Sequence, residues 1–456
     1  MRRLLLCTLC FGVLSSSAAW SAYDERAPYL GTKTLYKPQQ EASTYEQPPD
    51  NCQPIFISLL GRHGSRHVGS QKEFEAAWKA FQKAEDEGSL TKLGMKAYNW
   101  LKELHESKEL GLLTKEGYKE LYGIGKRMAE QYPDLFEDAA VELSTTSVKR
   151  TQQSRDAFQD GLLSQLDGDV DFKYTQAKPG EDYELRFFDS CTRYKSYQHG
   201  EGKERREMIQ DWVLGAEVTK RQIYQTMENL MKSPLPLTKL GDENTKVVGE
   251  LNSLCQSDYN VQPKKGEKKF CSLLDKDLRH SFLYGGDDLE TYYILGPVQT
   301  AQDHDNQSIN FTMACTALNS FLDDIESAAQ NTNATVAHLR FAHLETVLPL
   351  SVLMGLHQTD KDLDAHENPQ WRSEEFAGMG SNVQWIAYSC KSGDQKNYKV
   401  KMLYNEKEVK FPAPGCENSY YCDWELLKAY YHELYRYYGL GSCSLGEWNR
   451  VCGNVK

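Results

Sequence analysis

The amino-acid sequence predicts an α/β fold, with a central, mostly parallel sheet flanked by helices and an inserted, mostly α-helical cap domain. Apolar runs rich in β-branched residues alternate with helical patterns from Cys52 to about Gln165, and this alternation resumes at about Ala334. Between these parts the chain shows helical patterns and loops but few strand signals. An α/β domain interrupted by an insertion explains this order. We expect the α/β domain to comprise residues 52–165 and 332–456, and the cap to comprise residues 166–331.

The N-terminus has the pattern of a signal peptide, which we expect to cover residues 1–21. Arg2 and Arg3 precede the apolar run Leu4–Leu14, and small residues follow up to Ser21. The apolar run is too short to cross a bilayer, which takes about 20 apolar residues. The sequence therefore predicts a protein that is secreted or lies in the lumen of the secretory pathway, with a retained membrane anchor as the alternative.

The first helix with a clear start and a clear apolar face follows Thr114. A threonine at this place can cap the helix by accepting a hydrogen bond from a free backbone N–H. Leu121, Ile124, Met128 and Tyr132 then recur at helical spacing, so they share one face.

The cap and the second α/β part carry further signals. In the cap we expect a long helix over Glu204–Met231 and a solvated basic loop over Lys264–Lys269. In the second α/β part we expect strands over Val383–Tyr388 and Tyr398–Phe411, a hairpin turn at Asn405-Glu406, and a helix capped by Asp423 that ends at Gly439.

The net charge of −12 restricts the partners of the chain. Removal of Arg2 and Arg3 with the signal peptide would make the charge more negative by two. An acidic protein repels nucleic acids and anionic membranes, so we expect no nucleic-acid partner. No apolar run after the signal peptide is long enough to cross a bilayer, so we also expect no membrane span after signal removal. A small phosphate ester remains a possible partner, because a local arginine cluster can attract it. The candidates for such a cluster are Arg62, Arg66, Arg150 and Arg186.

The cysteines predict disulfide bonds. Of the twelve, Cys7 and Cys10 leave with the signal peptide, and the ten that remain are an even number in an exported chain. The sequence leaves their connectivity open. Pairs that are close in sequence are the natural first guesses: Cys255 with Cys271, and Cys443 with Cys452.

The exported chain also carries acceptor motifs for N-glycosylation. Asn306, Asn310 and Asn333 are each followed two residues later by serine or threonine. Asn333 lies just before an expected strand, so we expect it at the amino end of that strand, away from the ligand-binding edge of the sheet.

The most informative stretch is Arg62-His63-Gly64-Ser65-Arg66-His67, which follows the apolar strand pattern Ile55–Leu60. Open α/β sheets bind ligands at the carboxyl ends of their strands. Arginine forks match phosphate oxygens, and an imidazole between them can attack phosphorus. A surface loop that happens to be basic is the alternative reading of these residues alone.

Two distant segments favour the catalytic reading. A short strand beginning at Val141 leads into a hydroxyl-rich loop and Arg150. Another strand, beginning near Ala334, delivers His343 and then, two residues later, Glu345. Three strand ends with complementary chemistry are hard to explain as chance.

No metal or cofactor is predicted. Cys416 and Cys422 lack the spacing of metal ligands, and no Cys-x-x-Cys pair remains after the signal peptide. His63 and His67 are four residues apart, but the glycine and the arginines around them fit an anion better than a cation.

These segments resemble the histidine acid phosphatases. Arg62-His63-Gly64-Ser65-Arg66 matches the start of the family signature Arg-His-Gly-x-Arg-x-Pro, and Val68 stands at the proline position. His343-Leu344-Glu345-Thr346 is similar to the His-Ala-Glu-Thr of the multiple inositol polyphosphate phosphatase branch, with leucine in place of alanine. The same branch is indicated by Leu185–Cys191 (LRFFDSC) and by Leu113-Thr114 with its helix.

The resemblance runs from about Cys52 into the C-terminal region, and it implies roles for the candidate residues. It implies that His63 attacks phosphorus and forms a phosphohistidine, and that Glu345 protonates the leaving alcohol. Arg62, Arg66, Arg150 and His343 are implied to surround the phosphoryl group, and Arg186 and Arg193 are candidates for the other phosphates of the substrate.

The function implied is a secreted phosphomonoesterase that hydrolyses inositol polyphosphates. Two alternatives stay open. One is a phosphatase with another preference, either a broad-specificity acid phosphatase or a bisphosphoglycerate phosphatase. The other is a secreted binding protein on a catalytically decayed phosphatase fold, which Val68 and Leu344 motivate because they depart from the family pattern.

Overall fold

The computed structural model describes residues 29–232, 243–261, 269–298, 308–357, 371–392 and 395–454. The expected signal peptide at residues 1–21 lies outside these ranges, as do residues 264–268 of the expected basic loop. All statements of absence below concern the described residues.

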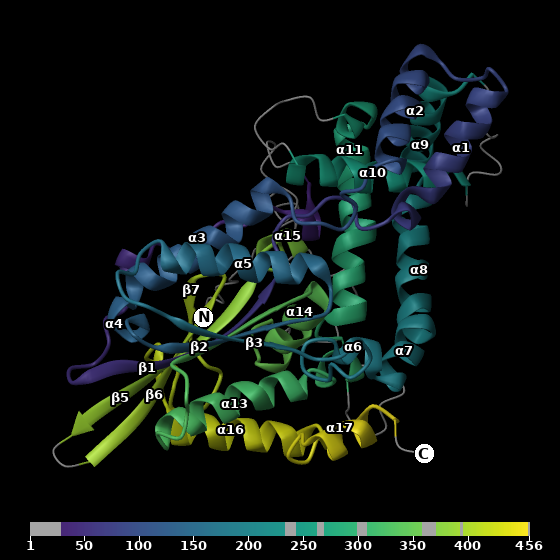
Figure 1. Cartoon of the computed structure of the whole chain (residues 1–456). Coiled ribbons are helices and arrows are strands. Elements are labelled where there is room, and N and C mark those ends of the chain that lie inside the picture. The colour runs from purple at the N-terminus through teal and green to yellow at the C-terminus, as the bar shows by residue number, and fades with distance from the viewer. Residues whose placement is uncertain are drawn as a thin grey trace, which may run out of the picture.

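The centre of the fold is an eight-stranded mixed sheet in the order β3-β2-β4-β1-β5-β6-β7, with β8 paired to β6 (Figure 1). The first four strands in this order are parallel, and the others pair antiparallel. This confirms the predicted α/β fold. The strands are β1 (Cys52–Arg62), β2 (Ala140–Thr145), β3 (Asp171–Gln176), β4 (Ala337–Ala342), β5 (Asn382–Ser392), β6 (Gln395–Tyr404), β7 (Lys407–Val409) and β8 (Tyr421–Asp423).

The register of the parallel strands brings their carboxyl ends together. Arg62 of β1 lies opposite Ala342 of β4, and Thr145 of β2 lies opposite Phe341 of β4. The residues that follow these strands therefore meet at one edge of the sheet. His63 and His343 are among them.

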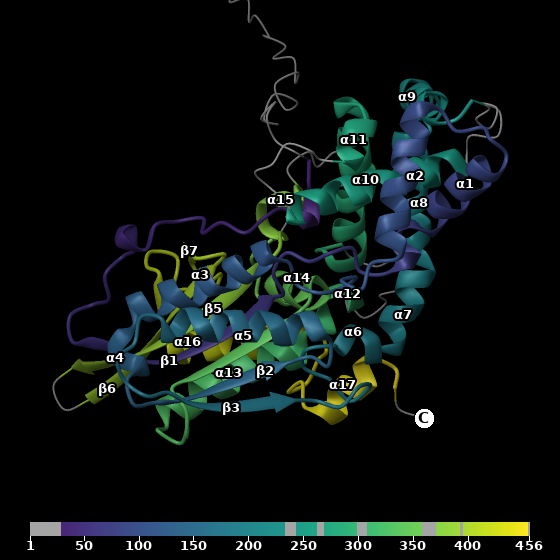
Figure 2. The ribbon, with the colours of Figure 1, turned by 45° about the horizontal axis from the view of Figure 1, so that its top comes forward.

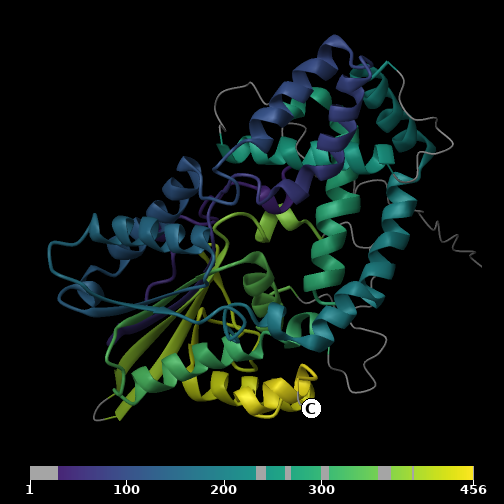
Figure 3. The same cartoon turned by 45° about the vertical axis from the view of Figure 1, so that its right-hand side comes forward.

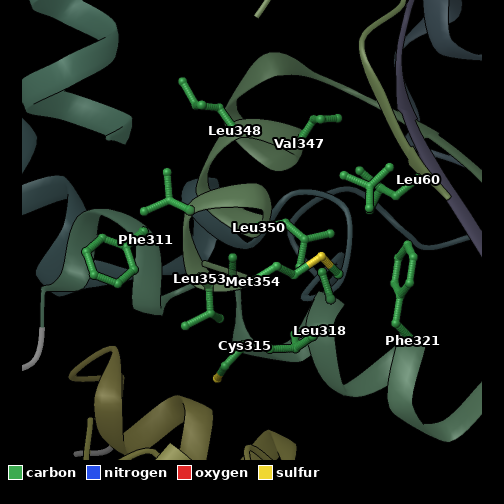
Figure 4. Close-up of a cluster of buried hydrophobic side chains, with 14 of the residues drawn as sticks. Leu60, Phe311, Cys315, Leu318, Phe321, Val347, Leu348, Leu350, Leu353 and Met354 are labelled. Carbon is green, nitrogen blue, oxygen red and sulfur yellow. The ribbon is translucent and has the colours of Figure 1, made fainter. Parts of the chain in front are cut away.

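Helices cover both faces of the sheet (Figures 1 and 2). On one face, α3 (Lys115–Gln131) and α5 (Lys149–Leu163) bury a core with Leu59, Leu143 and Leu339 of the strands. On the other face lie α13 (Cys315–Ala329), α14 (Leu344–Leu353) and α16 (Trp424–Tyr437). Figure 4 shows how this second core closes around α14: Leu348, Leu350 and Met354 pack among Leu60, Phe311, Leu318 and Phe321.

A third hydrophobic core belongs to a helical region beside the sheet (Figure 3). Its helices α1 (Glu75–Asp86), α2 (Lys92–His105), α9 (Glu217–Leu230) and α10 (Glu243–Val261) pack on one another. This helical region includes α1 and α2, which precede residue 166, where we expected the cap to begin. Conversely, β3 and α13 fall inside the expected cap range of 166–331, yet β3 pairs with β2 and α13 packs on β1.

The sequence pattern did not predict strand β3, for a physical reason. It is an edge strand whose residues Asp171–Gln176 are almost all exposed, so it lacks the apolar alternation of a half-buried strand.

The single long helix expected over Glu204–Met231 is wrong. Two helices, α8 (Glu201–Leu214) and α9, are separated at Gly215-Ala216, where Ala216 takes an extended conformation with ψ 138°. The helical spacing of apolar residues does not reveal such a break, because the pattern can continue across one extended residue.

Other local predictions are confirmed. Thr114 caps α3 by accepting a hydrogen bond from the Gly117 N–H at 3.0 Å. Asn405 and Glu406 both have positive φ and form the turn between β6 and β7. Asp423 caps α16, and Gly439, with φ +64°, follows the end of that helix.

The remaining helices are short. They are α4 (Pro133–Phe136), α6 (Phe187–Ser190), α7 (Thr192–His199), α11 (Lys276–Phe282), α12 (Ile309–Thr312), α15 (Ser373–Phe376) and α17 (Leu445–Val451), with the single-turn segments η2 (Gly31–Lys33), η3 (Ala42–Thr44), η4 (Gln71–Phe74), η6 (Phe270–Leu273), η7 (Leu283–Asp288) and η8 (Thr291–Leu295).

Ten cysteines form five disulfides, as the even number predicted. The pair Cys255–Cys271 is as expected, but the expected pair Cys443–Cys452 is wrong. The other pairs are Cys52–Cys390, Cys191–Cys452, Cys315–Cys443 and Cys416–Cys422. Three of these join residues more than 100 positions apart, which proximity in sequence cannot suggest.

The three glycosylation motifs have different positions. Asn310 is fully buried, and its side-chain N–H donates to the Gly296 carbonyl, so the folded chain leaves no room for a glycan there. Asn333 lies before the amino end of β4, as expected, and Asn306 lies outside the described residues.

Within the described ranges, no helix combines the length and the apolar composition that crossing a bilayer requires.

The contact between α3 and α5 generates a stability prediction. A Cβ on Gly161 of α5 would lie 2.0 Å from the Tyr122 carbonyl oxygen, so Gly161→Ala must push the helices apart. Overpacking of this kind costs about 1–3 kcal/mol. We expect Gly161→Ala to lower the midpoint of thermal unfolding.

The control is Gly446→Ala in α17, where a Cβ meets nothing within 4 Å, and where alanine favours the helix over glycine by about 0.5–1 kcal/mol. An unchanged midpoint for Gly161→Ala would contradict this account of the helix contact.

Candidate active site

His63 is the first residue of the loop that follows β1, and both of its backbone polar groups are hydrogen-bonded to neighbouring segments. Its N–H donates to the Ala342 carbonyl at 3.0 Å, and its carbonyl accepts from the Gly380 N–H at 3.1 Å. The side chain is only 3% exposed. The residue therefore has a fixed position at the carboxyl edge of the sheet.

The environment of the His63 ring determines which of its nitrogens carries the proton. Its Nδ1 lies 2.9 Å from the Gly64 carbonyl, which can only accept, so Nδ1 carries the proton and Nε2 keeps its lone pair. Burial lowers the pKa of His63 well below its ordinary value, and the nearby charges of Arg150 and Arg62 lower it further. The ring is therefore neutral, and Nε2 is available to attack an electrophile.

Gly64 lets the loop lie directly on α3. A Cβ at this position would stand 2.5 Å from the Gly117 carbonyl oxygen and 2.5 Å from Leu121 Cδ2. The Gly64 N–H also donates to Ser154 Oγ of α5 at 3.1 Å. Glycine is thus required here by close approach.

Arg62 and Arg66 flank this histidine, as the motif predicts. Arg62 is 5% exposed, and its Nη1 donates to the carbonyls of Thr32 at 2.5 Å and Ala377 at 2.7 Å. Burial lowers the pKa of Arg62 to about 10, which still leaves it charged at neutral pH. Arg66 Nη1 donates to the His67 carbonyl at 2.9 Å.

The second segment brings Arg150 to the same place. It lies in the first turn of α5, and its Nη2 is 3.4 Å from Nδ1 of His343. Burial and the neighbouring charge of Arg66 lower the pKa of Arg150 to about 10. Its Nε is buried without a hydrogen-bond partner among the described residues, a donor left available for a ligand.

His343 completes the cluster from the end of β4. Its ring centroid is 5.7 Å from that of His63. Arg186 Nη1, which can only donate, lies 2.9 Å from Nε2 of His343, so Nε2 accepts and the proton resides on Nδ1. The Nδ1 proton then lies beside Arg150 Nη2, which cannot accept it. The Nδ1–H of His343 and the Nη2 hydrogens of Arg150 can therefore donate to the same anion.

Arg186 and Arg193, the two candidates for contacts with the other phosphates of the substrate, have different environments. Arg186 contacts His343, forms an ion pair with Asp189 and lies over the Phe188 ring at 5.3 Å. Arg193 instead donates to the Val451 carbonyl at 3.1 Å, next to the disulfide of Cys452. The structure therefore brings Arg186 into the cluster and leaves Arg193 at the C-terminal segment.

Glu345 lies in the first turn of α14, two residues after His343, and is exposed. Its negative charge raises the pKa of Arg62 and of Arg150, so it lies within electrostatic range of both. Leu344 packs against the core around α14, and Val68 is buried in the core of the cap. These two departures from the family pattern therefore have structural places.

The arrangement can bind a tetrahedral oxyanion. Arginine donors and a histidine N–H converge around a neutral imidazole, and a carboxylate stands nearby to exchange protons. Among the residues that the structure describes, no three histidine, cysteine, aspartate or glutamate side chains gather in a way that could hold a metal ion.

Sequence reasoning missed several residues that hold this cluster. Thr146 Oγ1 lies 3.1 Å from His343 Nε2. Buried Glu120 accepts from the Ser65 N–H at 2.6 Å and from Ser65 Oγ at 2.8 Å, and Thr32 holds Arg62. These residues lie far from the motifs along the chain, and a buried glutamate on a helix looks like a surface residue in sequence.

Comparison with known proteins shows the family of the chain. The family model for the histidine phosphatase superfamily (branch 2) matches residues 55–405. The human protein named multiple inositol polyphosphate phosphatase 1 is 23% identical over 488 residues, covering 96% of this chain and 93% of that protein.

Solved structures share the fold. A Bifidobacterium longum multiple inositol polyphosphate phosphatase, in complex with inositol hexasulfate, superposes with a TM-score of 0.73 at 20% identity, covering 89% of this chain and 97% of that one. The phytase from D. castellii superposes with a TM-score of 0.66 at 17% identity, covering 94% and 88%.

The different environments of Arg186 and Arg193 generate a prediction about anion binding. Loss of a charge-assisted hydrogen bond costs about 1.5–3 kcal/mol, so Arg186→Ala should weaken binding of inorganic phosphate about tenfold to a hundredfold. Arg193→Ala removes an equal charge away from the cluster and should leave the phosphate affinity within about twofold. Titration calorimetry measures both, and equal weakening by the two variants would contradict this assignment.

Proposed function

The chain belongs to branch 2 of the histidine phosphatase superfamily, and we propose that it hydrolyses phosphate monoesters of inositol polyphosphates. The observation that carries the proposal is the neutral His63 ring, whose Nε2 is unprotonated and stands among Arg62, Arg150 and His343. The substrate class is suggested by the names of the relatives and by the inositol hexasulfate bound in the Bifidobacterium structure.

In the proposed first step, Nε2 of His63 forms a bond to phosphorus as the bond from phosphorus to the ester oxygen breaks. Arg62, Arg66, Arg150 and His343 hold the phosphoryl oxygens throughout. Phosphoryl transfer depends mainly on positioning and on stabilisation of charge, which accounts for the concentration of arginine. No metal ion or cofactor is needed for this role.

Glu345 is proposed to handle the protons. In the first step it gives its proton to the leaving inositol oxygen, so the alcohol departs neutral. In the second step a water molecule attacks phosphorus, Glu345 takes a proton from that water, and the bond from phosphorus to Nε2 breaks. Inorganic phosphate leaves, and His63 returns to its starting state.

The electrostatics of His63 suit an acidic medium. Its pKa lies well below the ordinary value because the ring is buried beside arginines. The nucleophile therefore stays neutral at pH values where an exposed histidine is already protonated. The sign of this shift favours activity that persists into mildly acidic solution.

The disulfides bear on where the protein acts. Five disulfides are typical of an oxidising compartment, so we propose export through the secretory pathway, directed by residues 1–21.

Arg186 is proposed to contact substrate phosphate. No substrate contact is proposed for Arg193, whose guanidinium donates to the Val451 carbonyl.

A phosphate-release assay on inositol hexakisphosphate and p-nitrophenyl phosphate tests the substrate class. We expect the purified protein to release phosphate from inositol hexakisphosphate, because the arginine cluster favours a highly charged ester. Release from p-nitrophenyl phosphate alone would favour a broad-specificity acid phosphatase. Release from neither would favour a binding protein on a decayed phosphatase fold.

The role of His63 is tested by substitution and by trapping. His63→Ala should fold and lose turnover, since it lacks the attacking nitrogen. Enzyme quenched during turnover should carry an acid-labile phosphoryl group on His63. His67→Ala is the control, because His67 faces Glu109, with Nε2 3.7 Å from its carboxylate, and has no role in the proposal. Full activity of His63→Ala would remove it as the nucleophile.

Glu345→Gln tests the proton donor, because it keeps the shape of the side chain and removes the acid. General acid catalysis contributes about 10²–10⁴-fold where the leaving group needs a proton. An inositol alkoxide needs one, whereas nitrophenolate does not. The pre-steady-state burst should therefore slow strongly on inositol hexakisphosphate and little on p-nitrophenyl phosphate. Equal slowing on both, or slowing on neither, would argue against this role.

A further inference from the structure

The N-terminal arm of the described chain begins beside α15 and α10 and then runs past β7 and α3 (Figure 2). Its segment η2 contacts α10, α15 and η7. The arm precedes β1 in the sequence and contains no residue of the catalytic motifs. Its hydrogen bonds nevertheless reach the catalytic loop, directly at Arg62 and indirectly through Met379-Gly380 and Glu120.

The arm reaches the guanidinium of Arg62 through one carbonyl. Arg62 Nη1 has two hydrogens, and both are used, one on the Thr32 carbonyl and one on the Ala377 carbonyl. The opposite edge of the guanidinium, formed by Nε and Nη2, makes no such contact, and Nε is buried without a partner among the described residues. This edge is the fork that binds an oxyanion through two parallel hydrogen bonds.

Two further connections join the arm to the loop backbone. The Thr34 carbonyl accepts from the Met379 N–H at 2.8 Å, and the adjacent Gly380 N–H donates to the His63 carbonyl at 3.1 Å. The Tyr36 N–H donates to Glu120 at 2.9 Å, and Glu120 in turn accepts from Ser65. The arm is thus linked to the loop at Arg62, His63 and Ser65.

The cap holds the arm from the other side. Gly31 has φ +53°, and a Cβ there would lie 2.1 Å from Asp287 Oδ2 of η7. The Thr32 N–H donates to the same carboxylate. Buried Lys33 donates from Nζ to Ser253 of α10, to the backbone carbonyl at 3.2 Å and to Oγ at 2.5 Å.

We propose that the arm segment Gly31–Tyr36 is a positioning element of the active site, which turns the Nε–Nη2 edge of Arg62 toward the phosphoryl group. The inference rests on the proposed function for its kinetic readout. Asp287 of the cap lies directly against Gly31 and so fixes the position of the arm. The adjacent Thr32 carbonyl accepts a hydrogen bond from Arg62 Nη1. This bond orients the guanidinium so that its Nε–Nη2 edge faces the phosphoryl group. Packing of the cap and the geometry of the phosphate site are thereby coupled through one short stretch of chain.

Gly31→Ala tests the proposal with a matched control. The added methyl group must displace Asp287 or the arm, and displacement of a positioned group by about 1 Å can cost about a hundredfold in rate. Gly88→Ala carries the same backbone penalty, since Gly88 has φ +62°, but a Cβ there meets nothing within 4 Å. Both variants should lose similar thermal stability from the backbone. Only Gly31→Ala should lower kcat/KM for p-nitrophenyl phosphate, by about tenfold or more, and weaken binding of inorganic phosphate.

A second pair of variants covers the case in which Gly31→Ala does not fold. Asp287→Asn replaces one acceptor oxygen of the contact with the arm by an NH2 group and adds no heavy atom. Asp258→Asn makes the same change in a carboxylate of α10 that accepts from the Phe270 N–H at 2.8 Å and has no hydrogen bond to the arm. We expect weaker phosphate binding for Asp287→Asn only.

Phosphate binding, measured by calorimetry, separates this inference from the proposed function. If the wild-type protein binds phosphate and hydrolyses no ester, the proposed function fails while the test of the arm still stands. If Gly31→Ala and Gly88→Ala have the same kcat/KM and the same phosphate affinity, the arm is structural only and the inference is overturned. Where Gly31→Ala does not fold, equal values of kcat/KM and phosphate affinity for Asp287→Asn and Asp258→Asn overturn it in the same way.

Discussion

The active site depends on holding like charges together. Arg62, Arg150 and Arg186 converge around the two imidazoles, and burial together with mutual repulsion lowers the pKa of Arg62 and Arg150 to about 10. At neutral pH both remain charged, so the folded chain carries an unfavourable concentration of positive charge. A bound oxyanion relieves that repulsion. The same repulsion between the arginines therefore favours binding of an anion among them.

Neutral acceptors hold Arg62 in place, because its guanidinium donates to the backbone carbonyls of Thr32 and Ala377. Arg66 and Arg186 have mixed partners. Arg66 donates to the His67 carbonyl and pairs with Glu73, and Arg186 donates to a His343 nitrogen and pairs with Asp189. Carbonyl oxygens orient the Arg62 guanidinium without neutralising it, so its positive charge stays available to an anion.

The rest of the fold provides the rigidity that this arrangement requires. Parallel strands β1, β2 and β4 place three chain segments at one edge, and close helix packing at Gly64 and Gly117 seats the loop on α3. The buried Glu120, whose pKa burial raises to about 7, accepts hydrogen bonds from both the loop and the arm. Each support comes from a different part of the chain, so the geometry of the site draws on contacts with the sheet, α3 and the arm.

The sequence by itself determined the α/β fold and the chemical groups of the candidate site. Strand patterns ending in Arg62-His63, in Arg150 and in His343 could be predicted because apolar periodicity and capping are local properties. The break between α8 and α9, the polar edge strand β3, most disulfide pairings and the separation of Arg193 from Arg186 were decided only by the tertiary structure. So were the roles of Thr32, Glu120 and Asp287. These features depend on contacts between residues distant in the chain, and no local pattern of residue types encodes which distant group a side chain will meet.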